Sequence, residues 1–200
     1  MLLITLQYIP PGLDVAFLAI KQDALQHSYY PFVFYTHVYF SMFALLAGFT
    51  QFSETFRSKY ARLHRTIGKV YIFIVLFISG PTGFIMGCLA NGGWVAQIAF
   101  CLLAVFWMFF TYQALTAIKN GNVCAHKKWM YRSYALTLSA ITLRLWKWGI
   151  VLVFQPRPMD VYRIVAWLGW VGNWIVVEWM IWFKNKKHSN IIINTVALNS

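Results

Sequence analysis

Acidic residues and charged residues in general are scarce in this sequence. Only five of the 200 residues are Asp or Glu, and charged residues make up 11% of the chain. A soluble domain usually carries about a quarter charged residues. The shortage of acids argues against a zinc hydrolase, because such a site needs three protein ligands around an open position.

Cysteine is also scarce, and the motifs of several enzyme classes are missing. The three cysteines, Cys88, Cys101 and Cys124, form no CxxC pair, so no disulfide framework is implied. The chain has no Gly-rich phosphate loop, no Walker pattern and no serine nucleophile elbow. Its first residues lack a basic segment and a small-residue cleavage site, so we do not interpret them as a signal peptide.

Apolar residues are correspondingly abundant, with 60% of the chain hydrophobic and 19% aromatic. Seventeen Lys and Arg residues give a formal net charge of +12. Nucleic-acid binding requires a contiguous basic surface, whereas these charges lie in short segments between long apolar runs. The pattern therefore indicates a protein whose partner is the lipid bilayer, and we expect no nucleic-acid binding.

The apolar runs are long enough to be membrane spans, which need about 20 residues. Five segments qualify: 31–52, 70–89, 94–118, 131–154 and 161–183. A sixth, 1–20, is interrupted by Pro10-Pro11-Gly12 and contains Asp14. It is either a short span followed by an interfacial helix or the remainder of a fuller first span. We predict an all-α polytopic transmembrane bundle with five clear spans and a short N-terminal sixth. It forms one domain over 1–188 with a polar tail at 189–200.

The cations are distributed unequally between the two sides of the predicted membrane. Twelve fall on one side, and the other side has three cations balanced by three acids. The positive-inside rule places the richer side in the cytoplasm. We therefore expect a multi-pass protein of the bacterial inner membrane, with basic loops 53–69 and 119–132 and the C-terminus cytoplasmic.

Four ionisable residues are predicted to lie at membrane depth, away from the ends of the spans: His37, Arg144, Lys147 and Glu178. Such groups are costly in a bilayer and usually functional. Arg144 and Lys147 are three residues apart on one helix face. With His37 at similar depth they would form a cationic patch for a haem propionate, a lipid headgroup or a carboxylate substrate. Alternatively, Arg144 pairs with Glu178 or bonds backbone carbonyls, and Lys147 extends outward to the interface.

Two histidines, His64 and His126, begin similar basic segments and are followed seven or eight residues later by a tyrosine. They are predicted to lie at the same membrane face. Histidines from two helices can hold haem iron, so haem b is the candidate cofactor, with nearby cations for its propionates. The alternative is an interfacial role, in which each ring binds backbone at a helix start and the cations meet anionic headgroups.

An ordered set of motifs over roughly residues 30–150 resembles the bacterial predicted membrane proteins grouped as domain of unknown function 2306. The resemblance implies a multi-pass helical inner-membrane protein and no established activity. The three histidines and the intramembrane arginine of that family match His37, His64, His126 and Arg144. The motifs are His37 with Ala44-Leu45-Leu46-Ala47-Gly48 and Gln51-Phe52, Leu63-His64-Arg65 with Gly68-Lys69-Val70-Tyr71, His126 with Trp129-Met130 and Arg132-Ser133-Tyr134-Ala135-Leu136, and Thr142-Leu143-Arg144.

Three classes of function remain open from the sequence. The first is a small b-cytochrome-like electron-transfer protein, with His64 and His126 as iron ligands and Arg144 as an anion or quinone contact. The second is a carrier of a small anionic or lipidic molecule bound by His37, Arg144 and Lys147. The third is a non-catalytic accessory subunit of a larger membrane complex, whose partners would be other membrane subunits.

Overall fold

The computed structural model describes residues 12, 18, 25–155 and 157–198, and this part of the chain is helical without strands. The all-α prediction is therefore confirmed there. The predicted first segment, 1–20, lies outside the described residues except for positions 12 and 18. The elements are α3 (Tyr30–Gln51), α4 (Glu54–Lys59), α5 (Ala61–Phe73), the π-helical segment η2 (Ile74–Ser79), α6 (Gly80–Cys88), α7 (Trp94–Lys119), α8 (Val123–Thr137), α9 (Ser139–Phe154) and α10 (Pro158–Leu198).

Each of the five predicted apolar segments falls on a helix or a helix pair. In the part of the chain that is described, four helices are long and apolar enough to cross a membrane, and one of them is the continuous run α5–η2–α6. The pair α8–α9 meets the same criteria together, but with a bend of 41° between its two helices. The chain is thus a multi-pass membrane protein with four to five candidate spans.

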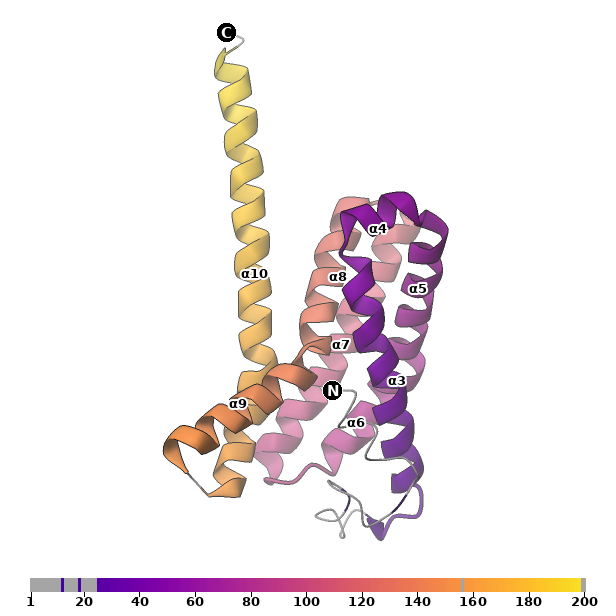
Figure 1. The fold of residues 1–200 in the computed structure, drawn as a ribbon, viewed down its shortest axis with the longest axis vertical. Helices are drawn as coiled ribbons and strands as arrows, with labels where there is room; N and C mark the ends of the chain where they lie inside the picture. The colour runs from indigo at the N-terminus through magenta and orange to yellow at the C-terminus, as the bar shows by residue number, and fades with distance from the viewer. Residues whose placement is uncertain (1–11, 13–17, 19–24, 156, 199–200) are drawn as a thin grey trace.

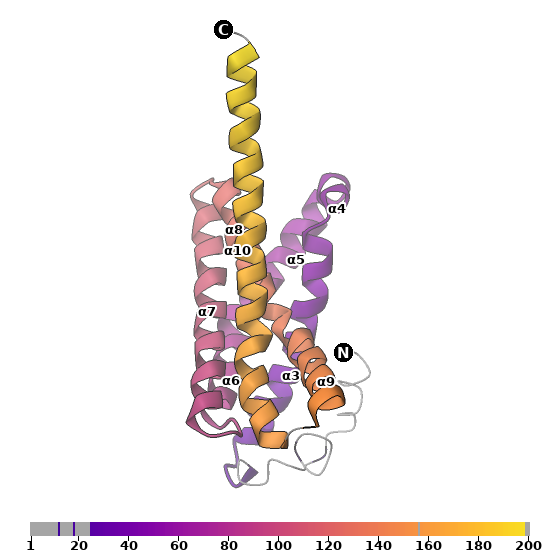
Figure 2. The same ribbon diagram turned by 90° about the vertical axis from the view of Figure 1, so that its left-hand side faces the viewer.

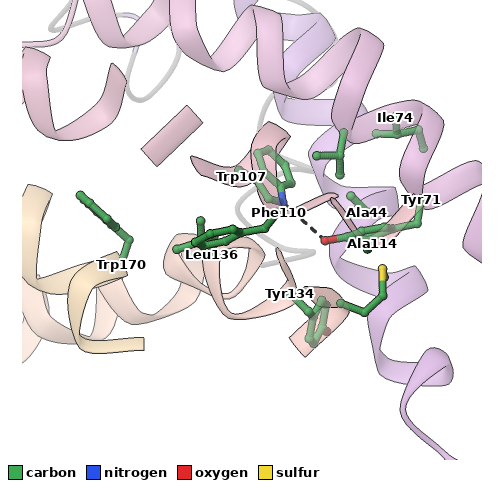
Figure 3. Packing of buried hydrophobic residues seen from close by; sticks show 11 residues of the cluster. Ala44, Tyr71, Ile74, Trp107, Phe110, Ala114, Tyr134, Leu136 and Trp170 are labelled. Carbon is green, nitrogen blue, oxygen red and sulfur yellow. Dashed lines mark hydrogen bonds between the residues drawn. The ribbon is translucent and has the colours of Figure 1, made fainter. Parts of the chain in front are cut away.

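Helices α3, α5, α6, α7 and α8 lie side by side as a bundle, while α9 leans outward from it (Figures 1 and 2). Helix α10 packs against α9, α8 and α7 and then continues beyond the bundle (Figure 1). Aromatic and aliphatic side chains from α3, α5, α7, α8 and α10 form the main core, which includes Tyr71, Trp107, Phe110, Tyr134 and Trp170 (Figure 3). We call the end of the bundle where α4 lies and α5 and α8 begin the basic end.

The basic segments 53–69 and 119–132 are largely helical, so their prediction as loops is wrong. Helix α4 is capped by Ser53, whose hydroxyl accepts from Phe56 N at 3.2 Å, and α8 is capped by Asn122, whose amide oxygen accepts from Ala125 N at 2.9 Å. Such caps satisfy backbone donors at a helix start. Hydropathy detects only the apolar part of a helix, and here the helices extend past it. Helix α10 likewise continues without a break across the predicted boundary at 188.

The predicted span 131–154 is bent at Leu138, between α8 and α9. The hydroxyls of Thr137 and Thr142 donate to the backbone carbonyls of Ser133 and Leu138, at 3.2 and 3.3 Å. Bonds of this kind to the preceding turn bend helices. Asn173 of α10 donates to the Thr142 hydroxyl at 3.0 Å, which ties the bend to α10. The bend directs α9 away from the bundle.

Candidate functional site

His64 and His126 occupy equivalent places at the basic end. Each is the fourth residue of its helix, α5 or α8, and its backbone N–H bonds the carbonyl of the N-cap residue. Seven residues later, Tyr71 and Ser133 hydrogen-bond each other at 2.8 Å. Seven residues make nearly two helical turns and about 10.5 Å of rise. Each histidine therefore lies nearly two turns from the Tyr71–Ser133 bond, in the layer of its own helix nearer the basic end.

The layer below the histidines is a buried network of hydroxyl and indole groups. Tyr71 Oη lies 2.8 Å from both Ser133 Oγ and Thr137 Oγ1, and Trp107 Nε1 donates to Thr137 Oγ1 at 3.0 Å. Trp107 Nε1 also donates to Tyr71 Oη, at 3.4 Å (Figure 3). Thr111 Oγ1 bonds Ser133 Oγ at 2.7 Å. The network joins α5, α7 and α8 and fixes their register, because each buried polar group requires its partner.

The ring of His126 is oriented by a backbone carbonyl. Its Nδ1–H donates to Ala114 O of α7 at 2.8 Å. This bond fixes the neutral tautomer that carries its lone pair on Nε2. Metal-ligating histidines in proteins are usually held in this way. Nε2 of His126 is therefore the nitrogen available to a ligand.

Two buried polar atoms at this end of α3 and α5 have no hydrogen-bond partner among the described residues. They are His64 Nδ1 and Gln51 Nε2. The Gln51 amide lies over Gly68, since a Cβ built at Gly68 would approach Gln51 Oε1 to 3.2 Å. Gly68 is one helical turn from His64, so the Gln51 amide of α3 packs against α5 one turn away from His64. Buried polar groups of this kind call for a water, ion or ligand.

Positive charge surrounds the histidine pair. Arg57 and His126 both lie within electrostatic range of His64. Arg65 and Lys127 adjoin the histidines in sequence and are exposed. The pair thus lies in an environment that favours a ligand carrying negative charge.

His37 lies between α3 and α6, away from the basic end. Its Nδ1–H donates to Ser79 O at 3.0 Å, and Thr82 Oγ1 is 3.3 Å away. Gly83 makes room for the ring, since a Cβ there would lie 2.9 Å from His37 Cε1. The carbonyl that it binds ends the π-helical segment η2, which precedes Pro81. Pro81 lacks an N–H and disturbs the helix before it. Like His126, His37 has a backbone-anchored Nδ1.

Arg144 and Lys147 lie on α9 and are exposed. Arg144 Nη1 donates to Ala140 O at 2.5 Å, so the predicted alternative of a bond to a carbonyl is confirmed. Helix α9 packs against α10 and α8, whereas His37 lies between α3 and α6. Within the described residues, the three side chains do not form a common hydrogen-bonded cluster.

Glu178 of α10 pairs with Arg132 of α8. The two make a bidentate ion pair, with distances of 2.5 and 2.9 Å, and Trp174 Nε1 donates to the same carboxylate at 3.0 Å. The Arg132 guanidinium also stacks over the Trp129 ring, 4.6 Å from its centroid. The alternative that paired Glu178 with Arg144 is therefore wrong. The Arg132 guanidinium is thus engaged in an ion pair with Glu178.

Sequence reasoning assigned no role to Gln51 or to the hydroxyl network of Tyr71. The amide of Gln51 becomes notable only once it is buried without a partner. The repeated spacing of seven residues from His64 to Tyr71 and from His126 to Ser133 was the available signal. A metal site with three or more His, Cys, Asp or Glu ligands is absent from the described residues.

Comparison with known proteins gives a family but no characterised relative. No curated protein and no solved structure matches the chain. The model of a family described as "Predicted membrane protein (DUF2306)" matches residues 34–181. That range begins within α3 and ends within α10, and it contains His37, His64, His126, Arg144 and Glu178. The chain belongs to this family of predicted membrane proteins.

Proposed function

We propose that the protein is a small electron-transfer protein that holds haem b between α5 and α8 at the basic end. His64 and His126 are its iron ligands. The observation that carries this proposal is their equivalent placement, each one layer beyond the Tyr71–Ser133 contact. Histidines from two helices of a bundle can hold haem iron in a dry site between them.

The residues present fit such a group in their chemistry. His126 is anchored through Nδ1 to Ala114 O, which leaves Nε2 for iron. His64 carries a buried nitrogen without a partner. Arg65 and Lys127 would neutralise the propionates. A bound haem supplies one-electron transfer, while the protein supplies the ligands, the low-dielectric surroundings and the positive field.

The test is reduced-minus-oxidised visible spectroscopy of the protein expressed with ample haem. The full chain should show a low-spin haem difference spectrum. His64→Ala and His126→Ala should each abolish it, and His27→Ala, which changes an exposed histidine, should leave it unchanged. Absence of haem from the full chain would overturn the proposal. Loss of the signal only in His37→Ala would show that the ligand assignment is wrong.

A second function, the binding of a small anionic or lipidic molecule at the same place, is favoured by Gln51. Its buried Nε2 is a donor and needs an acceptor oxygen, such as that of a carboxylate, phosphate or carbonyl. Mass spectrometry of extracts from the purified protein should then detect a bound oxygen-containing ligand, and Gln51→Leu should reduce its amount. If neither haem nor such a ligand is found but a stable partner protein co-purifies, the accessory-subunit function is favoured instead.

The proposed orientation places the basic end in the cytoplasm of a bacterial inner membrane. Support comes from the excess of cations at that end, which includes Arg57, Arg65, Lys119 and Lys127. Electrons would then enter or leave the haem near the cytoplasmic face.

A further inference from the structure

Two of the three cysteines approach each other at the hairpin between α6 and α7. Cys88 is the last residue of α6 and Cys101 lies in α7, and their sulfur atoms are 3.6 Å apart. Both are free thiols, and Cys88 is exposed while Cys101 is partly buried. A spacing of thirteen residues with no CxxC motif gives no hint of this contact in the sequence.

Close packing of the two helices produces the approach. Gly87 lies against α7, and a Cβ built there would be 3.1 Å from Cys101 N and 3.2 Å from Cys101 Sγ. The backbones are therefore nearly in contact beside the two thiols. A disulfide needs Cα atoms about 4.4–6.8 Å apart and brings the sulfurs to about 2.0 Å. The close backbone contact at Gly87 favours the required Cα separation, and rotation of the two side chains would bring the sulfurs from 3.6 Å to bonding distance.

We propose that Cys88 and Cys101 are a reversible dithiol–disulfide site that covalently joins α6 to α7. The site is separate from the histidine pair and independent of the proposed haem. In the oxidation, two S–H bonds break and one S–S bond forms. The oxidant, an azo compound or another disulfide, accepts the two electrons and the two protons. Exposed Cys88 provides the attacking thiolate, and Cys101 completes the bond.

The joined hairpin also supports α10. Arg163 Nε donates to Gly92 O in the α6–α7 turn at 2.9 Å, and Trp167 Nε1 donates to Val95 O at 3.2 Å. Oxidation would therefore fix the hairpin that anchors the start of α10. In the orientation proposed above, this end of the bundle faces the oxidising side of an inner membrane, where disulfides persist.

The test counts free thiols in the purified full chain before and after treatment with diamide, a membrane-permeant azo oxidant. After denaturation, each free thiol reacts with one maleimide-linked polymer, and each attached polymer slows the chain on a gel by one step. The untreated chain should show three additions, and the oxidised chain one, from Cys124. Reduction by dithiothreitol should restore three. In Cys124→Ser, oxidation should leave none while the protein remains monomeric.

Single replacements provide the controls. Cys88→Ser and Cys101→Ser should each keep both remaining thiols after the same treatment. Gly87→Ala should slow the reaction because the added methyl separates the helices, whereas Gly149→Ala, which has open space around it, should not. Three additions to the oxidised full chain, or a loss of thiols in Cys88→Ser equal to that of the full chain, would overturn the proposal.

Discussion

The hydroxyl of Tyr71 hydrogen-bonds α5 to α8 beneath the histidines. The loss of stability expected on its removal can be worked out from these bonds. Tyr71→Phe keeps the ring and creates no cavity, so only hydrogen bonds are lost. Two of these are short, to Ser133 and Thr137 at 2.8 Å, and the bond from Trp107 is longer, at 3.4 Å. Hydrogen bonds between membrane helices contribute about 0.6 kcal/mol each.

The hydrogen-bond partners of Tyr71 limit the loss of stability that Tyr71→Phe causes. Ser133 keeps its bond to Thr111 at 2.7 Å, and Thr137 keeps its bond from Trp107 at 3.0 Å. No buried group is left without a partner, so the large penalty for an orphaned polar atom does not apply. The expected loss in the free energy of unfolding is therefore about 1–2 kcal/mol, which is a factor of roughly 5–30 in the folded-to-unfolded ratio.

Equilibrium unfolding in mixed micelles titrated with SDS measures this loss. The matched control is Tyr112→Phe, because Tyr112 is 55% exposed and outside the network. Ser133→Ala combined with Tyr71→Phe should give less than the sum of the two single losses, since the replacements remove a shared bond. A loss for Tyr71→Phe no greater than that of Tyr112→Phe would refute the assignment of the network as the link between the helices.

Three further replacements test other contacts of the bundle. Gly48→Ala should lower the free energy of unfolding by about 1–3 kcal/mol in the same assay, because the new Cβ would lie 1.7 Å from an aromatic ring of α8. The control Gly149→Ala, with no neighbour within 4 Å, should lower it by less, and equal losses would contradict the close packing at Gly48. Arg132→Met leaves the Glu178 carboxylate without its cation and should lower the free energy of unfolding by about 2 kcal/mol. Adding Glu178→Gln to this variant should restore part of the lost stability, and no restoration would argue against the ion pair. In a variant that carries both Cys88→Ser and Cys101→Ser, a membrane-impermeant maleimide should label exposed Cys124 only in permeabilised cells; labelling of this variant in intact cells would reverse the proposed orientation.

Much of the fold could be predicted because membrane insertion depends on local composition. A run of about 20 apolar residues is favourable in lipid whatever its neighbours are. The five apolar segments accordingly fall on helices, and the shortage of acids and the clustering of cations were visible without a structure. The helix ends were less predictable, since polar caps such as Ser53 and Asn122 extend helices beyond the apolar run.

The candidate site was predictable only in part. Matching positions at the starts of two basic segments predicted that His64 and His126 lie at the same end of the bundle, and their pairing around a haem stays a prediction. The cationic patch of His37, Arg144 and Lys147 assumed a straight helix. The bend at Leu138 instead carries α9 outward. The hydroxyl bond from Thr142 to Leu138 is local, but the contact from Asn173 of α10 joins residues far apart in the sequence.

The membrane class and the approximate spans follow from the amino-acid order itself, because the free energy of placing a residue in lipid is largely a property of that residue. Which polar groups meet is decided by helix packing. The Arg132–Glu178 pair and the Cys88–Cys101 contact each join residues on different helices, and packing of α3 against α5 leaves the Gln51 amide buried without a partner. Their distances depend on crossing and rotation of whole helices, which no local pattern specifies.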